Sequence, residues 1–236
     1  MIIKILEQDV NTEHLNHDEL LYLNQFVDQK TLSLEELWQL MAQAWENLGA
    51  GYTENHQEAV AKFYASPVWL LNGIFTEWDP QSKQHREKIA EWVANIRPNL
   101  VVDFGGGYGS LGRKIAANCP NTDVKIVEPY PRKAALALAE QYTNLEYVAQ
   151  LPKNIDVLIA QDVLEHVLDP LATFYTLLEA VRVGGYVITA NCFYPVIKCH
   201  LPVNFHFRYT FALIVTQLGC DYLGTLPGVN HAQIFF

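Results

Sequence analysis

The feature that most constrains this chain is a run of glycines that directly follows a short apolar segment. Residues 100–104 read Leu-Val-Val-Asp-Phe, the glycine-rich loop Gly105-Gly-Gly-Tyr-Gly109 follows, and a helical pattern begins at Leu111. A short apolar run bounded by turn residues predicts a strand that is buried on both faces. Glycine is needed where the backbone turns with positive φ or where a ligand approaches the main chain. The pattern therefore predicts a strand–loop–helix unit whose loop holds a ligand, a ligand-free turn being the alternative.

Strands and helices alternate from this unit to the end of the chain. Apolar runs lie at residues 124–127, 155–160 and 186–190, with a weaker one at 145–148, and helical patterns at 111–118, 132–142 and 170–182 separate them. Such alternation predicts a doubly wound, Rossmann-like α/β fold with helices on both faces of the sheet. After a helix at 210–218, Pro227-Gly228 is expected to join strands 222–225 and 233–236 as a hairpin. The prediction is a mostly parallel sheet of seven strands whose last strand runs antiparallel.

The pattern of apolar residues predicts that residues 1–98 form a mainly helical region, which precedes a core at residues 99–236. Ser33 and Glu36 have the spacing of a capping box before an amphipathic segment, and further helices are predicted at 54–64 and 84–96, with a turn at Asp79-Pro80. All five tryptophans lie in this region, and such large rings need a surface to bury them. We expect the region to cap the carboxyl edge of the sheet. Docking of a partner away from the site is the alternative.

Charge and cysteine content argue against a nucleic acid partner, disulfide bonds and a metal site. The chain carries 16 basic and 26 acidic side chains, a net charge of −10, and its basic residues are scattered, so no nucleic acid partner is expected. The four cysteines lack a CxxC pair, which predicts free thiols and a cytoplasmic location. Cys199, His200 and His206 fit no common zinc spacing, so no metal is expected. No run approaches the roughly 18 apolar residues of a membrane span.

Two ligand classes compete for the glycine loop. Gly107-x-Gly109-x-x-Gly112 satisfies the dinucleotide fingerprint, and Glu128 follows 21 residues after Gly107. The longer pattern Asp103-x-Gly105-x-Gly107-x-Gly109 resembles the first motif of the class I methyltransferases that depend on S-adenosyl-L-methionine (SAM). An acid before the loop suits the ammonium and sulfonium groups of SAM and repels a pyrophosphate. SAM is therefore the preferred ligand, with a nicotinamide dinucleotide as the alternative.

Three later segments are similar to the same family. Val124-Lys-Ile-Val-Glu128-Pro129 places an acid at the end of the second strand, where the resemblance implies contact with the ribose hydroxyls of SAM. Gln161-Asp162-Val-Leu-Glu-His166 and the turn at Arg182-Val-Gly-Gly resemble the branch that contains quinone-biosynthesis methyltransferases. The resemblance covers about residues 100–236. It implies that SAM is contacted by the following residues: Asp103, Gly105, Gly107, Gly109, Glu128, Pro129, Gln161 and Asp162.

Two further contacts are less directly implied. Relatives often carry an acid after the third strand, near the adenine, where this chain has Tyr147-Val-Ala-Gln150; Gln150 or a backbone group is expected to replace it. Arg86 lies 17 residues before Asp103, and some relatives pair an upstream arginine with the SAM carboxylate. The alternative for Arg86 is a charge on a solvated helix face.

Methyl transfer from a sulfonium is a direct displacement, so the protein mainly aligns the acceptor with the methyl group. A general base is needed only where the acceptor must lose a proton; the candidates for contact with the reacting atoms are His166, His206 and Asp162. Tyr52, Tyr64, Trp69 and Phe75 could close the pocket, although core packing is the commoner use of such rings. The sequence predicts methylation of a small molecule, at oxygen before nitrogen or carbon. A protein or RNA methyltransferase and a non-catalytic SAM-binding protein remain alternatives, and the oligomeric state stays open.

Overall fold

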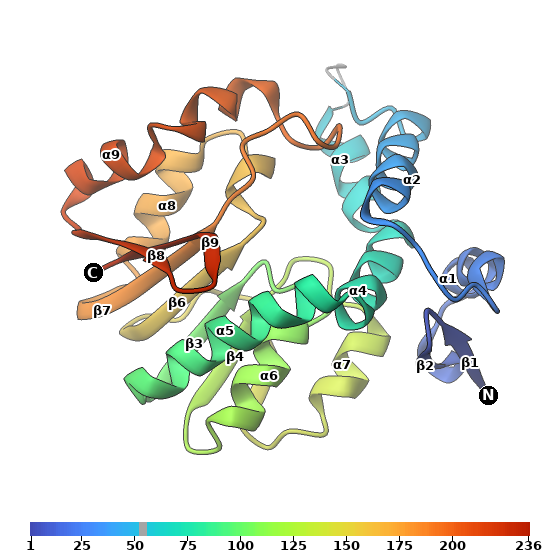
Figure 1. Cartoon of the computed structure of the whole chain (residues 1–236). Helices are drawn as coiled ribbons and strands as arrows, with labels where there is room; N and C mark the ends of the chain where they lie inside the picture. Colours follow the sequence, from blue (N-terminus) through green and yellow to red (C-terminus); the bar gives the residue numbers. More distant parts are fainter. Residues whose placement is uncertain (52–55) are drawn as a thin grey trace.

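The computed structural model describes residues 1–51 and 56–236, and one large sheet forms its centre (Figure 1). Across the described part of this sheet the strands are β5 (Leu145–Val148), β4 (Asp123–Val127), β3 (Leu100–Phe104), β6 (Ile155–Gln161), β7 (Val181–Ala190), β9 (Val229–Phe235) and β8 (Tyr222–Leu226). The strands from β5 to β7 are parallel to one another, and β9 is antiparallel to both β7 and β8. The predicted doubly wound, mostly parallel, seven-stranded sheet is confirmed.

Helices cover both faces of the sheet, which explains why its strands are continuous apolar runs. On one face, α5 (Pro80–Ile96) and α6 (Ser110–Asn118) pack against side chains such as Val101. On the other face, α8 (Pro170–Leu178) and α9 (Phe211–Val215) pack against the neighbouring Val102. Successive strand residues point to opposite faces, so both valines are fully buried.

The N-terminal region forms its own core, in which helices predominate. Its elements are β1 (Ile2–Ile5), β2 (Gln8–Asn11), α1 (His17–Leu23), α2 (Leu34–Asn47), α3 (His56–Tyr64) and α4 (Val68–Trp78). The predicted capping box is present at the start of α2, where Ser33 Oγ accepts from the Glu36 N–H. The hairpin β1–β2 was not predicted. Its turn residues Leu6 and Glu7 have φ values of 48° and 63°, and such turns are normally signalled by Asn or Gly.

Two helix starts differ from the sequence-based expectation because a proline opens each of them. Pro67 is the N-cap of α4, a helix that was not predicted. At Asp79-Pro80, where a turn was expected, Asp79 is a non-helical break between α4 and α5. The second helix begins earlier than the predicted residue 84, since Asp79 caps α5 by accepting from the Ser82 N–H at 2.7 Å and Pro80 occupies the first helical position. Proline suits that position because the first N–H groups of a helix have no intrahelical partner.

The region after β7 returns to the N-terminal core. Ile197, Cys199 and Leu201 are buried in the same apolar cluster as Phe63 and Leu70, and Figure 1 shows this segment arching from the sheet toward α3. The predicted helix 210–218 is divided into α9 and a 3-10 turn at Thr216–Leu218, and a further 3-10 helix spans Pro202–Arg208. Helix α5 packs with the sheet, and the domain boundary at 98 stays a prediction.

Several bounds in the core differ from those that the sequence pattern indicated. The second strand of the C-terminal hairpin, β9, spans Val229–Phe235, where 233–236 was predicted. Helix α7 (Lys133–Ala139) ends three residues before the predicted 142. Helix α8 ends at Leu178, because Val181–Val183 already belong to β7. Among the described helices, none is long and apolar enough to cross a membrane.

Candidate functional site

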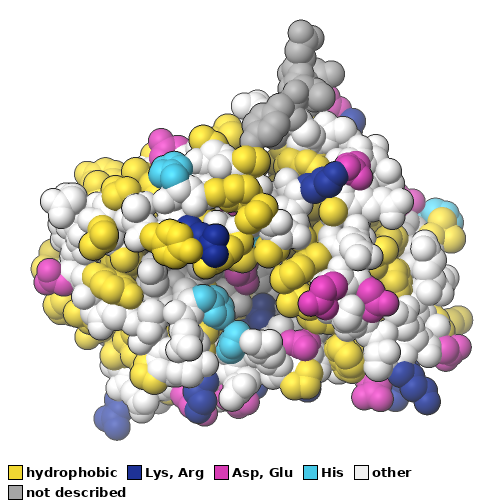
Figure 2. All heavy atoms as spheres, turned by 45° about the horizontal axis from the view of Figure 1, so that its top comes forward, with side chains coloured by type: hydrophobic (Ala, Val, Ile, Leu, Met, Phe, Trp, Pro, Cys, Tyr) yellow, Lys and Arg dark blue, Asp and Glu magenta, His cyan; other side chains and the backbone are white. Residues whose placement is uncertain are grey.

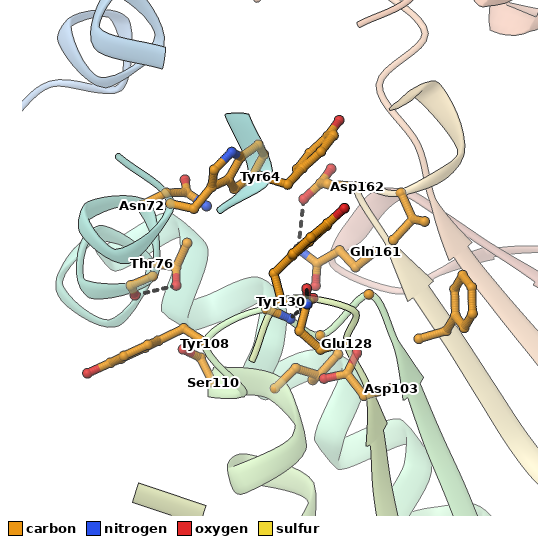
Figure 3. A pocket seen from close by; sticks show the side chains of 18 of the residues that line it. Tyr64, Asn72, Thr76, Asp103, Tyr108, Ser110, Glu128, Tyr130, Gln161 and Asp162 are labelled. Carbon is orange, nitrogen blue, oxygen red and sulfur yellow. Dashed lines mark hydrogen bonds between the residues drawn. The ribbon is translucent and has the colours of Figure 1, made fainter. Parts of the chain in front are cut away.

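A cavity of about 360 Å³ opens at the carboxyl edge of the sheet, above β3, β4 and β6. In a doubly wound sheet this is the edge at which ligands bind, beside the point where the strand order reverses. The surface is hollowed there in Figure 2, and Figure 3 shows side chains from both the sheet and the N-terminal helices around the hollow. The lining includes Tyr64, Trp69, Asn72, Thr76, Arg86, Asp103, Gly105, Gly107, Tyr108, Glu128, Tyr130, Arg132, Gln161, Asp162 and His166.

The glycine loop forms the floor of this cavity because its backbone adopts conformations that other residues avoid. Gly105, Gly107 and Gly109 have φ values of 72°, 53° and 77°. A Cβ at Gly109 would lie 2.5 Å from Tyr147 Oη, a hydroxyl that donates to the Gly107 carbonyl at 3.0 Å. A Cβ at Gly107 would meet nothing closer than 4.0 Å. The side of Gly107 that lacks a side chain is therefore open space.

Asp103 lies at the end of β3 as a buried acid with an unused acceptor. Its Oδ2 atom is buried and has no hydrogen-bond partner among the described residues. Burial raises the pKa of Asp103 to about 7, while the Arg86 guanidinium opposes the rise. Burial also lowers the pKa of Arg86, with Asp162 and Asp103 opposing that change. A buried, unpaired carboxylate oxygen is costly unless a donor meets it, so Asp103 can receive a cationic group of a ligand.

Glu128 directly follows β4, and its carboxylate accepts hydrogen bonds from the glycine loop and from the segment after β4. Its Oε2 atom accepts from the Gly107 N–H at 3.0 Å, and its Oε1 atom accepts from the Tyr130 N–H at 2.9 Å (Figure 3). A carboxylate offers about four lone-pair positions, so further donors can be accommodated. Pro129 is exposed and also lines the cavity. This corner can therefore accept hydrogen bonds from a pair of ligand hydroxyls.

The end of β6 supplies a strained backbone and an amide. Asp162 has a φ of 53°, and its N–H donates to the Ala190 carbonyl at 2.7 Å. A positive φ at a residue other than glycine is uncommon, and such strain often marks functional positions. Gln161 Nε2 donates to Asp162 Oδ2 at 3.2 Å, while Gln161 Oε1 is buried without a partner in the described chain. The amide oxygen is thus available to a ligand donor.

An aromatic wall made of Tyr64, Trp69 and His166 faces this floor. The rings of Tyr64 and Tyr130 are nearly parallel, at 11°, with centroids 6.4 Å apart. The His166 ring lies 6.1 Å from both Tyr64 and Trp69 at steep angles. Trp69 Nε1 is a buried donor that no described acceptor meets. The wall therefore presents apolar faces together with one unused N–H group.

His166 has its tautomer set by the segment after β7. Its Nδ1 atom lies 3.1 Å from the Cys199 carbonyl, which can only accept, so Nδ1 carries the proton and Nε2 keeps a lone pair. Burial, assisted by the neighbouring His200, lowers the pKa of His166 to about 3. Glu165, His166 and His200 each offer a ligand atom within 4.8 Å of the others, close enough to share a cation. His166 is neutral and can accept a hydrogen bond.

Most residues predicted from the sequence come together here, and a few do not. Gly109 is buried behind the loop as the N-cap of α6, while Gln150 and His206 are exposed and lie outside the described lining. Phe75 is buried in the N-terminal core, and Tyr52 lies outside the described residues. Sequence reasoning missed Asn72, Thr76 and Arg132. The first two lie on α4, whose start signal at Pro67 went unrecognised.

The chain is similar to proteins of one enzymatic class. A family described as a methyltransferase domain matches residues 79–194. The chain is 27% identical over 194 residues to the ubiquinone biosynthesis O-methyltransferase of Yersinia pestis (strain Pestoides F), covering 76% of this chain and 74% of that protein. It is 26% identical to the protein of the same name from Nitrosomonas europaea, and there the match spans 47% of this chain and 54% of the relative.

Solved structures agree on the fold. A proposed O-methyltransferase of Nostoc punctiforme PCC 73102 superposes with a TM-score of 0.57 at 18% identity, covering 94% of this chain and 76% of that one. The N-methyltransferase NodS of Bradyrhizobium japonicum, solved with S-adenosyl-L-homocysteine (SAH), has a TM-score of 0.51 at 11% identity, covering 84% of this chain and 96% of that one. At these identities the likeness establishes the architecture.

Proposed function

We propose that the chain is a class I SAM-dependent methyltransferase, which transfers a methyl group from SAM to an oxygen of a small-molecule acceptor. The observation that carries this proposal is the Oδ2 atom of Asp103 beside the glycine loop, which is buried and has no hydrogen-bond partner within residues 1–51 and 56–236. A bound ammonium would satisfy that oxygen, whereas the phosphates of a dinucleotide would be repelled by it. When bound, SAM supplies an electrophilic methyl group on a sulfonium.

On the cofactor side, groups in the floor and beside it match parts of SAM. Asp103 would accept from the ammonium, and Arg86 would pair with the carboxylate of the methionine end. Glu128 would accept from the ribose hydroxyls, and Tyr130 beside it would flank the adenine. The open side of Gly107 lets the ligand approach the backbone. Gln150 has no support from the geometry and stays a prediction.

On the acceptor side, the aromatic wall would orient the substrate and exclude water. Tyr64 and Trp69 supply rigid apolar faces, which suit alignment of a planar group with the methyl. The Nε2 lone pair of His166 would accept a hydrogen bond from the acceptor hydroxyl. Because its pKa is about 3, His166 would orient this hydroxyl and not retain its proton. Asp162, exposed at the cavity, is the candidate that passes the proton to water.

The test measures both the cofactor and the product. Purified protein would be titrated with SAH and with NAD in a calorimeter, and then incubated with methyl-labelled SAM and a panel of small phenols and amines. Phenols head the panel because several relatives are named for O-methylation in ubiquinone biosynthesis. We expect tighter binding of SAH than of NAD, and label on a phenolic oxygen. Preferential NAD binding would overturn the assignment, and label on amines alone would overturn the O-directed part.

A further inference from the structure

Arg132 joins the cofactor loop to the N-terminal region through three hydrogen bonds. It follows β4 in the segment Glu128-Pro-Tyr-Pro-Arg132. Its Nη1 donates to Glu19 Oε1 at 2.9 Å, and its Nη2 donates to the carbonyls of Tyr64 at 3.1 Å and Ser66 at 2.6 Å. The guanidinium therefore holds α1 and the α3–α4 junction at once. An arginine makes such multidentate contacts where a lysine cannot.

Glu19, the acidic partner of Arg132, is buried and makes a second hydrogen bond. Glu19 is 5% exposed and Arg132 is 13% exposed. The second carboxylate oxygen of Glu19 accepts from the Asn16 N–H at 2.9 Å, which closes the capping box of α1. A charge buried in this way loses much when its partner is removed, because water cannot replace the missing donor. The ion pair is thus a specific junction between two regions and not a loose surface contact.

The segment from Glu128 to Arg132 is stiff, so a displacement of Glu128 would also displace Arg132. Pro129 and Pro131 restrict its φ angles, and the Tyr130 N–H is held by Glu128 Oε1 at 2.9 Å. Glu128 therefore sits at one end of a stiff segment and the Arg132 junction at the other. Tyr64, whose carbonyl accepts from Arg132, carries the ring that faces Tyr130 at 6.4 Å. Arg132 therefore binds the backbone of the residue whose ring faces Tyr130.

We propose that Arg132 is a positioning residue that couples occupation of the cofactor site to the placement of the N-terminal cap over the acceptor cavity. The inference rests on the proposed function, because it takes Glu128 as a contact of SAM. A ligand that fixes Glu128 steadies the 128–132 segment and, through Arg132, the carbonyls of Tyr64 and Ser66. By reciprocity, a cap held in place favours cofactor binding by the same factor.

The test compares Arg132→Met with Lys133→Met, a neighbouring exposed cation whose loss changes the net charge equally. Hydrogen exchange of α1 and of residues 64–71 is measured with and without SAH, together with the SAH dissociation constant. In the wild type and in Lys133→Met, SAH is expected to slow exchange in both segments. In Arg132→Met this slowing is lost, and SAH binds about fivefold more weakly, the lower end of usual coupling.

A second variant separates positioning from loss of the fold. Glu19→Gln keeps one oxygen, which can still accept from the guanidinium, and gives up the acceptor that the Asn16 N–H uses. It should therefore retain, at residues 64–71, the SAH-dependent slowing that Arg132→Met loses. Slowing in Arg132→Met equal to that of the wild type would overturn the coupling, as would its disappearance in Lys133→Met. Failure of the wild type to bind SAH would instead refute the proposed function. In that case faster exchange of residues 64–66 in ligand-free Arg132→Met still tests whether Arg132 holds the cap.

Discussion

The floor of the cavity is built from residues 103–128, whereas its aromatic wall joins Tyr64 to His166, 102 positions away. The floor depends on backbone: three glycines at positive φ and N–H groups held by Glu128. The wall depends on side chains from α3 and α4 and on His166, which contacts the Cys199 carbonyl. Substitutions in the floor should therefore weaken binding of the cofactor, and substitutions in the wall should raise the KM of the acceptor.

The largest effect is expected at Gly107. In Gly107→Val, the new side chain enters the open side of the loop, where no atom lies closer than 4.0 Å, and occupies space that the ligand needs. SAH affinity should fall by roughly 100-fold or more, at a cost to stability of about 1–2 kcal/mol from the positive φ. Calorimetry and thermal unfolding measure the two effects.

The control for this variant is Gly49→Val. Gly49 has a φ of 65°, no atom of the described residues lies within 4 Å of a Cβ built there, and it is not part of the described cavity lining. It therefore introduces the same backbone strain without blocking the site, and SAH affinity should be unchanged. Equal losses of affinity in both variants would mean that strain, and not occlusion of the floor, is responsible.

The next effect concerns Glu128. Glu128→Ala removes a charged acceptor and frees the Gly107 and Tyr130 N–H groups that it holds. We expect SAH binding to weaken by about 1–3 kcal/mol, with a smaller loss in Glu128→Gln, which keeps one oxygen. Glu146→Ala, at an exposed acid on β5 that pairs with Lys125, is the matched control. A dissociation constant that stays at the wild-type value in Glu128→Ala would place the ribose elsewhere.

The contrast between floor and wall also explains what the sequence predicted and what it did not. The bounds of β3 and β5 were predicted correctly, because a strand buried on both faces is one uninterrupted apolar run. Asp103 and Glu128 could be proposed as site residues because each sits at a fixed place beside its own strand. The members of the wall were named as candidates from the sequence, but their arrangement could not be predicted, since Trp69 reaches the cavity only through α4 and His166 is fixed by a carbonyl 33 residues away. The sequence offered Phe75 on equal terms, and that ring is buried in the N-terminal core.

An effect of intermediate size is expected from the ionisation of Asp103, which should make SAH affinity depend on pH. Burial raises its pKa from 3.8 to about 7, so at pH 6 the ligand-free protein carries this carboxyl protonated. Binding of an ammonium requires the ionised form, so SAH affinity should weaken as pH falls below 7, by up to about tenfold per pH unit. Calorimetry at pH 6, 7 and 8 measures this, and proton release at pH 6 appears as a dependence on buffer ionisation heat.

The raised pKa of Asp103 also makes the free energy of unfolding depend on pH. Because the folded-state pKa exceeds the unfolded one, the ligand-free fold binds the extra proton between about pH 4 and pH 7. The contribution of Asp103 to stability is therefore present below pH 4, falls as pH rises through that window, and is constant above it. Asp103→Asn should remove both dependences. SAH affinity that does not change between pH 6 and pH 8 in the wild type would contradict the assignment.

The smallest effect is expected in the wall, at Trp69. Its indole N–H is buried and meets no described acceptor, although the ring itself packs on Phe63 at 5.5 Å and Tyr64 at 5.2 Å. Trp69→Phe keeps most of that packing and removes the donor. If the acceptor molecule receives this hydrogen bond, its KM should rise roughly 3- to 10-fold, or about 0.5–1.5 kcal/mol, with SAH affinity unchanged.

The stability of Trp69→Phe without ligand shows whether the indole N–H serves the fold or the acceptor molecule. Leaving a buried donor unpaired costs free energy, so Trp69→Phe should unfold no more easily than the wild type when no ligand is present. Trp92→Phe, at a ring that packs on Tyr186 beside the sheet, is the matched control and should leave the KM of the acceptor unchanged. An unchanged KM in Trp69→Phe would show that the donor is not used by the acceptor. A loss of SAH affinity would show that the wall also serves the cofactor, and the division between the two halves would then fail.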